Sequence, residues 1–454
     1  MERRDFLKTT GAGVAAFTAS QALPGFAQQS ADLGIIRNPV LVKIFLRGGQ
    51  DQLNTIVPYR DKTYYGIRPT IHIPESESIP LDNQWAFHPA LEPLKAWYDK
   101  GRVAAVVNSG SPDGTRSHFD AQDFMEYAAP GNRSIYDGWL NRYLKATANP
   151  RGEDPYRIRA IAMQERLPRS MRGSYPAVAV PSNLNEMDEV LNVFEKFYGQ
   201  GDPEKLPFTL KGLEKKGGPA ETKKLKGLAG TVADANVAED PVMASGKFTI
   251  SYLRRLKELL YAKPETTYGS SREIGIGGEG VAQEYPGGWF SSRMQALARV
   301  IKADAGLQVA ATDIGGWDHH IGLGGLDGTL NRMLTFFAAS LAAFMEDLGP
   351  HLDRTLILVS TEFGRVCHEN GNDGSDHGHG GLTWLMGGNV RGGRVYGRWT
   401  GLEPSELFQN RDLNVTTDFR QIYADVLRKH MGFEPPEGFF PDFTPTERGL
   451  GLFT

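Results

Sequence analysis

Short apolar segments, each bounded by Gly, Pro, Asn or Ser, recur along the 454-residue chain and constrain its fold more than any other feature. The segments with the length and composition of β-strands are 40–46, 103–108, 158–163, 177–180, 307–312, 355–360 and 382–386. Several are apolar throughout rather than at alternate positions, which is typical of strands buried on both faces of a sheet. They predict a sheet with a core on either side.

Helical patterns separate these strands. Apolar residues within 329–348 recur about every 3.6 residues, which predicts an amphipathic helix. A second helix is expected over 419–427, with Thr416 or Thr417 capping its start. Strands that alternate with helices predict an α/β fold with a doubly wound, mostly parallel sheet and helices on both faces.

The segment 199–246 interrupts this pattern. Lysines lie there among Gly, Pro and Ala, and no strand pattern is visible. We expect a solvated Lys-rich insertion or a cap over one edge of the sheet, with polyanion binding as the alternative.

The first 27 residues are predicted to be an export signal. Arg3-Arg4 followed by Phe6-Leu7-Lys8 resembles the twin-arginine signal, and the apolar stretch 11–22 is too short to span a bilayer. An ordinary basic N-terminus is the alternative. Cleavage after Ala27 would leave a single domain, 28–454, without a transmembrane span. We expect the twin-arginine translocase to export it to the periplasm or beyond the cell.

The composition excludes several classes of protein. Hydrophobic residues make up 40% and charged residues 23%, as in soluble globular proteins. The 50 Lys and Arg residues against 54 Asp and Glu give a net charge of -4, which argues against nucleic acid as a partner. Cys367 is the only cysteine, so an intramolecular disulfide and a thiolate metal site are both excluded.

Four polar clusters follow predicted strands: 47–51, 109–120, 313–320 and 362–365. The carboxyl ends of parallel strands share one edge of a sheet, where ligands bind, so these clusters should meet in one crevice. Carboxylates gathered there would repel one another without a cation among them. Mixed carboxylate and imidazole ligands suit Zn, Mn or Fe. The candidate metal ligands are Asp51, Asp313, Asp318, His320, Glu362, Asp376, His377 and His379.

The polar segment 370–381 leaves three interpretations open. It is a metal-ligand loop that brings Asp376 and either His377 or His379 into the crevice, a calcium loop, or a turn with incidental histidines. In 313–320, we expect only one of the two adjacent histidines to bind a given ion, and we favour His320. The alternative for 313–320 is an Asp-capped helix start beside a core tryptophan.

Two further clusters supply candidates for catalysis and for anion binding. Ser117 could act as a nucleophile at a helix N-terminus, with Thr115 as a rival and Arg116 as a neighbouring cation. The alternative is that Ser117 caps a helix over 118–127. Arg47 and Arg365 are candidates for anion binding, unless Arg365 forms a buried pair with Glu362.

The chain resembles the domain of unknown function (DUF) 1501 family. The resemblance rests on the motifs at 45–54, 117–123, 315–320, 362–365, 376–381 and 417–420, and on the twin-arginine start. It implies an alkaline-phosphatase-like α/β fold, in a superfamily of phosphatases, sulfatases and phosphoglycerate mutases that commonly bind two divalent metals. In that superfamily a Ser, Thr or modified Cys attacks a phosphoryl or sulfuryl centre.

The resemblance also assigns roles to particular residues. Asp51 resembles the ligand after the first strand, and Asp313, Asp318 and His320 resemble the ligands of one metal. Phe363 departs from the pattern, because it stands where the superfamily has a histidine of the second metal site. No close match identifies the nucleophile.

Together these observations predict an exported hydrolase of phosphate or sulfate esters that depends on a divalent metal (Zn, Mn, Fe or Ca). Its partner would be a small anionic ester. The alternative is a non-catalytic periplasmic protein with a structural metal that binds an envelope polymer or another protein. A redox metalloprotein is a third interpretation, suggested only by the export route.

Overall fold

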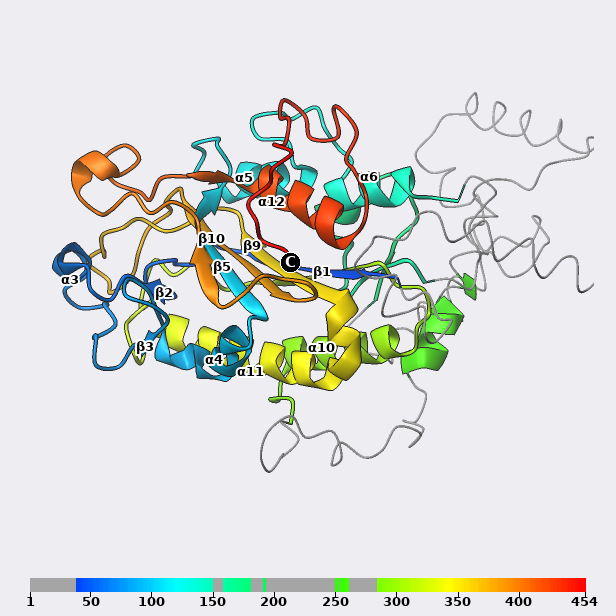
Figure 1. Cartoon of the computed structure of the whole chain (residues 1–454), viewed down its shortest axis with the longest axis horizontal. Helices are drawn as coiled ribbons and strands as arrows, with labels where there is room; N and C mark the ends of the chain where they lie inside the picture. The colour runs from blue at the N-terminus through cyan, green and yellow to red at the C-terminus, as the bar shows by residue number, and fades with distance from the viewer. Residues whose placement is uncertain (1–37, 150–157, 181–190, 193–249, 252, 261–283) are drawn as a thin grey trace, which may run out of the picture.

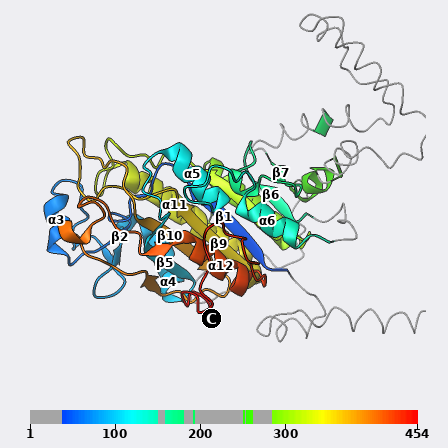
Figure 2. The same ribbon diagram turned by 90° about the horizontal axis from the view of Figure 1, so that it is seen from above.

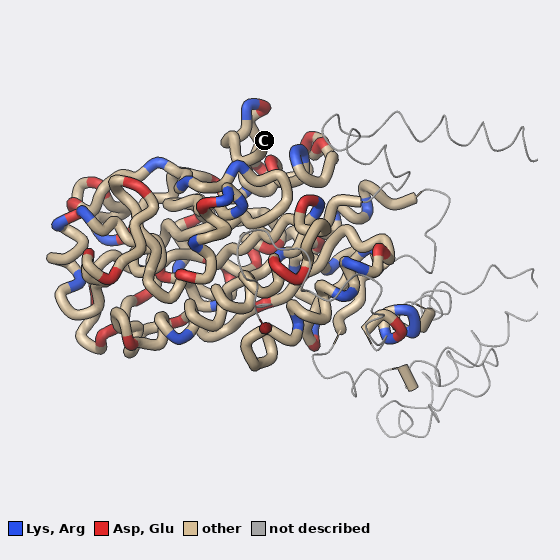
Figure 3. Tube along the Cα trace, turned by 60° about the horizontal axis from the view of Figure 1, so that its bottom comes forward, with Lys and Arg blue, Asp and Glu red and all other residues tan. Residues whose placement is uncertain are grey.

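The structure is a computed structural model of the chain, and it describes residues 38–149, 158–180, 191–192, 250–251, 253–260 and 284–454. The predicted signal (1–27) and the Lys-rich insertion (199–246) lie outside the described residues. Within the described ranges, no helix has both the length and the apolarity needed to cross a membrane. Acidic and basic residues are interspersed along this part of the chain (Figure 3).

A nine-stranded sheet forms the centre of the fold. Its strands, in spatial order, are β11 (Arg394–Tyr396), β5 (Val103–Gly110), β10 (Gly381–Gly387), β9 (Thr355–Thr361), β1 (Val40–Leu46), β8 (Val309–Ile314), β6 (Ala160–Ala162) and β7 (Val178–Ala179), with β12 (Thr417–Asp418) also pairing with β5. Figure 2 shows β5, β10, β9 and β1 side by side. A smaller antiparallel sheet contains β2 (Ile56–Val57), β4 (Ala86–Phe87) and β3 (Ile79–Pro80).

Helices cover both faces of the large sheet, as β1 shows most clearly. Val40, Val42 and Ile44 pack in one core, with residues of α4 (Glu92–Asp99), α10 (Trp289–Lys302) and α11 (Thr329–Leu348). Leu41 and Phe45 point the other way, toward α5 (His118–Tyr127), α6 (Trp139–Ala146) and α12 (Phe419–Asp425). The two helix layers lie on opposite sides of the sheet in Figure 1. Because side chains alternate along a strand, a strand apolar at nearly every position fills two cores at once.

Residues 250–251 and 253–260 are also helical, and the fold contains several short helical elements. They are α3 (Lys62–Ile67), the 3₁₀ helices η1 (Pro89–Leu91), η2 (Arg169–Met171), η5 (Gly349–Arg354) and η6 (Pro404–Glu406), and the π-helix η7 (Val426–His430).

The α/β fold with a mostly parallel sheet and helices on both faces is confirmed, as is the helix over Thr329–Leu348. The predicted cap of the second helix is wrong. Thr417 is part of β12, and Asp418 caps α12 by accepting a hydrogen bond from the Arg420 backbone N–H at 2.9 Å. The carboxylate of Asp418 reaches that N–H because residue 418 directly precedes the first helical turn.

Strand direction brings the polar clusters together. β1 is parallel to β8 and to β9, while β10 is antiparallel to both β9 and β5, so β5 runs in the same direction as β9. The carboxyl ends of β1, β5, β8 and β9 therefore share one edge. Because β10 is reversed, the chain enters it at that same edge, and the segment that precedes Gly381 lies there too.

Candidate metal centre

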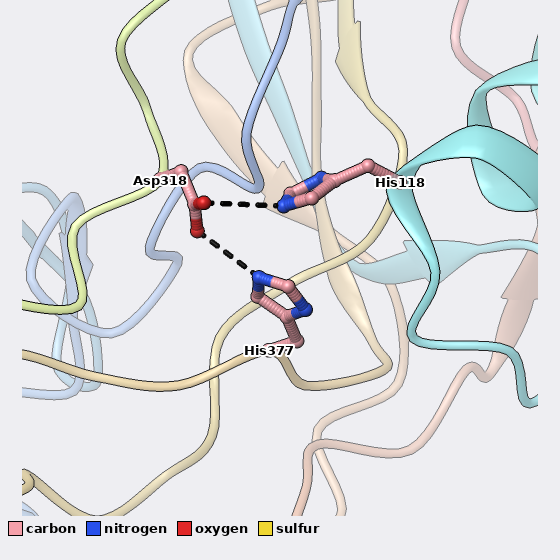
Figure 4. A group of neighbouring side chains, drawn as sticks. All are labelled: His118, Asp318 and His377. Carbon is pink, nitrogen blue, oxygen red and sulfur yellow. Dashed lines mark hydrogen bonds and ion pairs between the residues drawn. The ribbon is translucent and has the colours of Figure 1, made fainter.

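Asp318 lies at the centre of the polar cluster at this edge. Its Oδ2 is 3.3 Å from His118 Nε2, and its Oδ1 is 3.1 Å from Nε2 of both His320 and His377. Figure 4 shows His118 and His377 pointing toward the Asp318 carboxylate from α5 and from the segment before β10. The ligand atoms of His118, Asp318 and His377 lie within 4.8 Å of one another, and this group could hold a metal ion.

The backbone around Asp318 is held close to the end of β1. The Trp317 backbone N–H donates to the Arg47 carbonyl at 3.1 Å, and buried Arg365 donates to Asp318 Oδ1 at 2.7 Å and to the Gly48 carbonyl at 3.1 Å. Gly48 has a φ of 127°, and a Cβ at this position would lie 2.4 Å from the Asp318 backbone nitrogen. This close approach requires glycine at position 48.

Each of the three imidazoles is anchored through Nδ1. His118 Nδ1 lies 2.8 Å from Glu362 Oε1, and His320 Nδ1 lies 2.7 Å from Asp376 Oδ1. His377 Nδ1 lies 2.9 Å from the carbonyl oxygen of Arg116. Carbonyl and carboxylate oxygens only accept, so these contacts assign the proton to Nδ1 and turn the Nε2 lone pair toward Asp318. Histidines that bind metals are held in this way.

The Nε2 atoms of His320 and His377 are only 2.9 Å apart. With Asp318 Oδ1 they form a triangle with sides of 2.9, 3.1 and 3.1 Å. Three lone pairs directed at one another at this distance repel unless a proton or a metal cation lies among them. Ligands about 2.1 Å from a metal ion are about 3 Å apart at right angles, as in octahedral coordination, and about 3.4 Å apart at the tetrahedral angle. The triangle therefore has the dimensions of a metal site.

The charges around the triangle also favour a cation. Burial opposes ionisation of Asp318, but the hydrogen bond and charge of Arg365 prevail and lower its pKa to about 2. Burial likewise opposes ionisation of Glu362, but hydrogen bonds from His118 and Gln122 hold its pKa below the usual value. A hydrogen bond from His320 lowers the pKa of Asp376. With these three carboxylates ionised and Arg365 cationic, the net charge is 1 − 3 = −2, which a divalent ion neutralises.

The cluster has a buried aromatic side and an open side. The Phe363 ring, which is 3% exposed, lies 4.9 Å from the His118 ring and 5.0 Å from the His377 ring. The side chains of Asp318 and His320 are 43% and 41% exposed. An ion at the triangle could therefore be reached from solvent.

Asp51 has a different partner. Its two carboxylate oxygens lie 2.8 and 2.7 Å from Nη1 and Nη2 of Arg68, and both side chains are almost completely buried. Arg68 also donates to Asn54 Oδ1 and to the carbonyls of Val366 and Cys367. A guanidinium thus neutralises Asp51. A ligand role for Asp51 stays a prediction that these contacts do not support, and the described residues fit one ion better than two.

Asp313 and Arg47 bind each other beside the centre. Arg47 Nε donates to Asp313 Oδ2 at 2.7 Å, and its other nitrogens donate to Gln122 at 2.8 Å and Glu126 at 3.0 Å. The predicted ligand Asp313 is therefore already paired with an arginine. Glu362 supports His118 rather than facing the triangle.

The predicted catalytic residues lie at the start of α5. Ser117 occupies the N-cap position, but its side chain makes no capping hydrogen bond. Thr115 Oγ1 accepts from the Ser117 backbone N–H at 3.2 Å. The guanidinium of Arg116 is paired with Asp412, at 2.5 Å. Ser117 is thus one residue from an imidazole of the centre.

The segment 370–381 contributes unequally to the centre. His377 joins the triangle, whereas His379 is buried against the Phe408 ring at a centroid distance of 4.1 Å, and burial lowers its pKa to about 4. Asp373 accepts from Thr70 and Asp376 from His320, so the two aspartates face different partners.

His118 and Gln122 were not among the predicted site residues. With Glu126, they recur at intervals of four along α5, and such residues share one face of a helix. All three contact the network around Arg47 and Glu362. A polar stripe at intervals of four along a helix beside a predicted site was the signal that could have identified them.

Residues 271–438, the part of the chain that carries Asp318, His320 and His377, match the family model described as "Protein of unknown function (DUF1501)". The crystal structure of PsFucS1 sulfatase from Pseudoalteromonas sp. is similar over 89% of this chain and 69% of that chain, with 13% sequence identity and a TM-score of 0.32. No curated protein matches the sequence.

Proposed function

We propose that this chain is a metal-dependent hydrolase of phosphate or sulfate esters that uses one divalent ion, Zn, Mn or Fe. Asp318, His118, His320 and His377 would hold the ion. The observation that carries the proposal is the convergence of three Nδ1-anchored imidazoles on one ionised carboxylate at a solvent-accessible edge. A metal bound there would act as a Lewis acid on the ester and lower the pKa of a bound water.

The protein side chains would orient the centre and supply an attacking group. Arg365 holds Asp318 in place, and Glu362 and Asp376 keep two imidazoles turned toward it. The hydroxyl of Ser117 is free of capping contacts and lies beside His118 in the sequence, so it is our candidate nucleophile. Thr115 is the alternative.

The charge balance favours a singly charged substrate. Arg47, Arg116 and Arg365 are all paired with carboxylates. A divalent ion would bring the centre itself to about zero net charge. Such a site attracts a sulfate ester or a phosphodiester, each with one negative charge, more readily than it neutralises a dianionic phosphate monoester.

Two exposed apolar side chains suggest what the organic part of the substrate is like. Phe119 is 80% exposed and follows His118, and Ile321 is 73% exposed and follows His320. Ligand sites are lined largely by apolar and aromatic side chains, and these two directly follow proposed ligands in the sequence. We therefore favour an ester whose alcohol part has an apolar or ring face.

The test combines metal analysis with an ester panel. The purified mature chain should contain about one equivalent of metal and hydrolyse at least one aryl sulfate, phosphate monoester or phosphodiester. Asp318→Asn and His377→Ala should lose both metal and turnover. His368→Ala is the matched control, because His368 is exposed and near His377 in sequence but makes no contact with Asp318. Metal binding and turnover that survive both site variants would refute the proposal.

A non-catalytic protein with a structural metal is the second candidate. The paired arginines and the Phe363 ring against two imidazoles favour it. Metal bound by the wild type but lost in Asp318→Asn, without turnover on any ester, would support this candidate.

We further propose that the protein works outside the cytoplasm after twin-arginine export. The Arg3-Arg4 motif supports this location. Replacing both arginines with lysine should retain the chain in the cytoplasm, as cell fractionation would detect.

A further inference from the structure

Asp412 is a buried carboxylate whose side chain is fully inaccessible to solvent. Its Oδ2 accepts from Nε and Nη2 of Arg116 at 2.9 and 2.5 Å. Its Oδ1 accepts from Nη1 of Arg411 at 3.0 Å. One negative charge thus holds two arginines from different parts of the chain.

Both arginines also contact His377, from opposite sides of that residue. The backbone carbonyl of Arg116 accepts from His377 Nδ1 at 2.9 Å, and Arg411 Nη1 donates to the His377 backbone carbonyl at 3.0 Å. Arg116 also stands two residues before His118. The Asp412 carboxylate is therefore linked to the ring of His377 through Arg116 and to its backbone through Arg411.

A tight turn places Asp412 between the two arginines. Gln409 and Asn410 have φ values of 55° and 54°, and the Arg411 N–H donates to the Phe408 carbonyl at 3.2 Å. Positive φ at both central residues is typical of a type I′ turn. Phe408 and Asp412 exchange two backbone hydrogen bonds, of 2.8 and 3.0 Å, and Gln409 Oε1 accepts from Arg116 at 2.8 Å. The turn gives Asp412 a well-defined position.

We propose that Asp412 is a positioning residue for the metal centre, which acts by holding Arg116 and Arg411 so that His377 presents Nε2 to Asp318. Asp412 touches neither the triangle nor its open side. The inference rests on the proposed metal centre. It adds the 408–412 turn to the residues that support that centre, and the sequence patterns did not mark this turn as functional.

The decisive variant is Asp412→Asn. It keeps the size of the side chain but removes the charge that two arginines share, so His377 should lose its fixed orientation. Loss of such an outer contact typically weakens metal binding about 10- to 100-fold. The dissociation constant for Zn²⁺, measured by competition with a chromogenic chelator, should rise within this range. Asp412→Glu, which restores the charge, should recover part of the affinity.

Asp418→Asn is the matched control. Asp418 also pairs with an arginine, Arg420, and stabilises the start of α12, but it makes no contact with His377. Its metal affinity should equal that of the wild type even if its melting temperature falls. Wild-type Zn²⁺ affinity in folded Asp412→Asn, or an equal loss in Asp418→Asn, would overturn the inference.

Two further measurements keep the test decisive. If Asp412→Asn does not fold, Arg411→Met is the alternative. It removes only one of the two arginines that Asp412 holds, and the Arg411 side chain is 38% exposed, so the fold should tolerate the change. Zn²⁺ binding should still weaken. If the wild type binds no metal, the proposed function fails by itself. The His377 ring signals in the NMR spectrum should then still differ between the wild type and the variant, and unchanged signals would refute the positioning role.

Discussion

Replacing Glu362 with Gln should weaken metal binding without disturbing the fold. Glu362 is buried, and its Oε1 accepts from the Gly48 N–H, His118 Nδ1 and Gln122 Nε2 at 2.8, 2.8 and 2.9 Å. Its Oε2 lies 3.0 Å from the hydroxyl of Thr361. That hydroxyl can donate to the Leu46 carbonyl at 2.8 Å while it accepts from a glutamine amide. All the hydrogen bonds of position 362 can therefore survive, and only the charge is lost.

The magnitude follows from the bond between Glu362 and His118. A hydrogen bond to a charged group contributes about 1.5–3 kcal/mol and a neutral one about 0.5–1.5 kcal/mol, so the change removes roughly 1–1.5 kcal/mol from the anchoring of His118. This corresponds to a metal dissociation constant about 10-fold higher. The hydrogen bond to Glu362 is also the main factor that raises the pKa of His118 in the metal-free chain. That pKa should therefore fall in the variant.

Two assays decide the outcome. Chelator competition gives the metal dissociation constant, and NMR titration of the metal-free chain gives the pKa of His118. Asp425→Asn is the control, because Asp425 is a buried carboxylate that accepts from Gln421 and Leu450 and lies outside the centre. Glu362→Gln with unchanged metal affinity and an unchanged His118 pKa would refute the assigned role of Glu362.

Three further predictions test the surroundings of the centre. Arg68→Met leaves the buried charge of Asp51 unpaired and should lower the free energy of unfolding in urea by about 3–5 kcal/mol. Gly48→Ala places a methyl group against the Asp318 backbone, so calorimetry should detect weaker metal binding than in the wild type. Burial lowers the pKa of Lys43 from 10.5 to about 7. Between these values the unfolded chain binds more protons, so stability should rise with pH, and the rise should be absent in Lys43→Met denaturation curves.

The fold could be predicted because its signals are local. A strand such as 40–46, apolar at nearly every position, is stable only between two layers, and the period of 329–348 shows which face of that helix is buried. The antiparallel direction of β10 could not be predicted. The direction of β10 depends on whether the chain after β9 crosses to the opposite edge of the sheet or stays at the edge where β9 ends. Residues 362–380 stay at the edge where β9 ends, held by contacts such as that of Arg365 with Asp318.

The site was only partly predictable, for the same reason. Strand ends identified Asp318 and His320, and the polar segment 370–381 offered either His377 or His379, but sequence cannot show which cation neutralises which carboxylate. Asp51 looks like a ligand until Arg68, from just beyond α3, occupies both its oxygens. His118 looks like part of a helix cap until Glu362 turns its ring toward Asp318. Ion pairing therefore divides the carboxylates of this edge in two. Asp51 and Asp313 are neutralised by arginines. Glu362 and Asp376 are bound by imidazoles, and Asp318 is bound by imidazoles and by Arg365, so these three carboxylates share one arginine and leave a charge that a metal would balance.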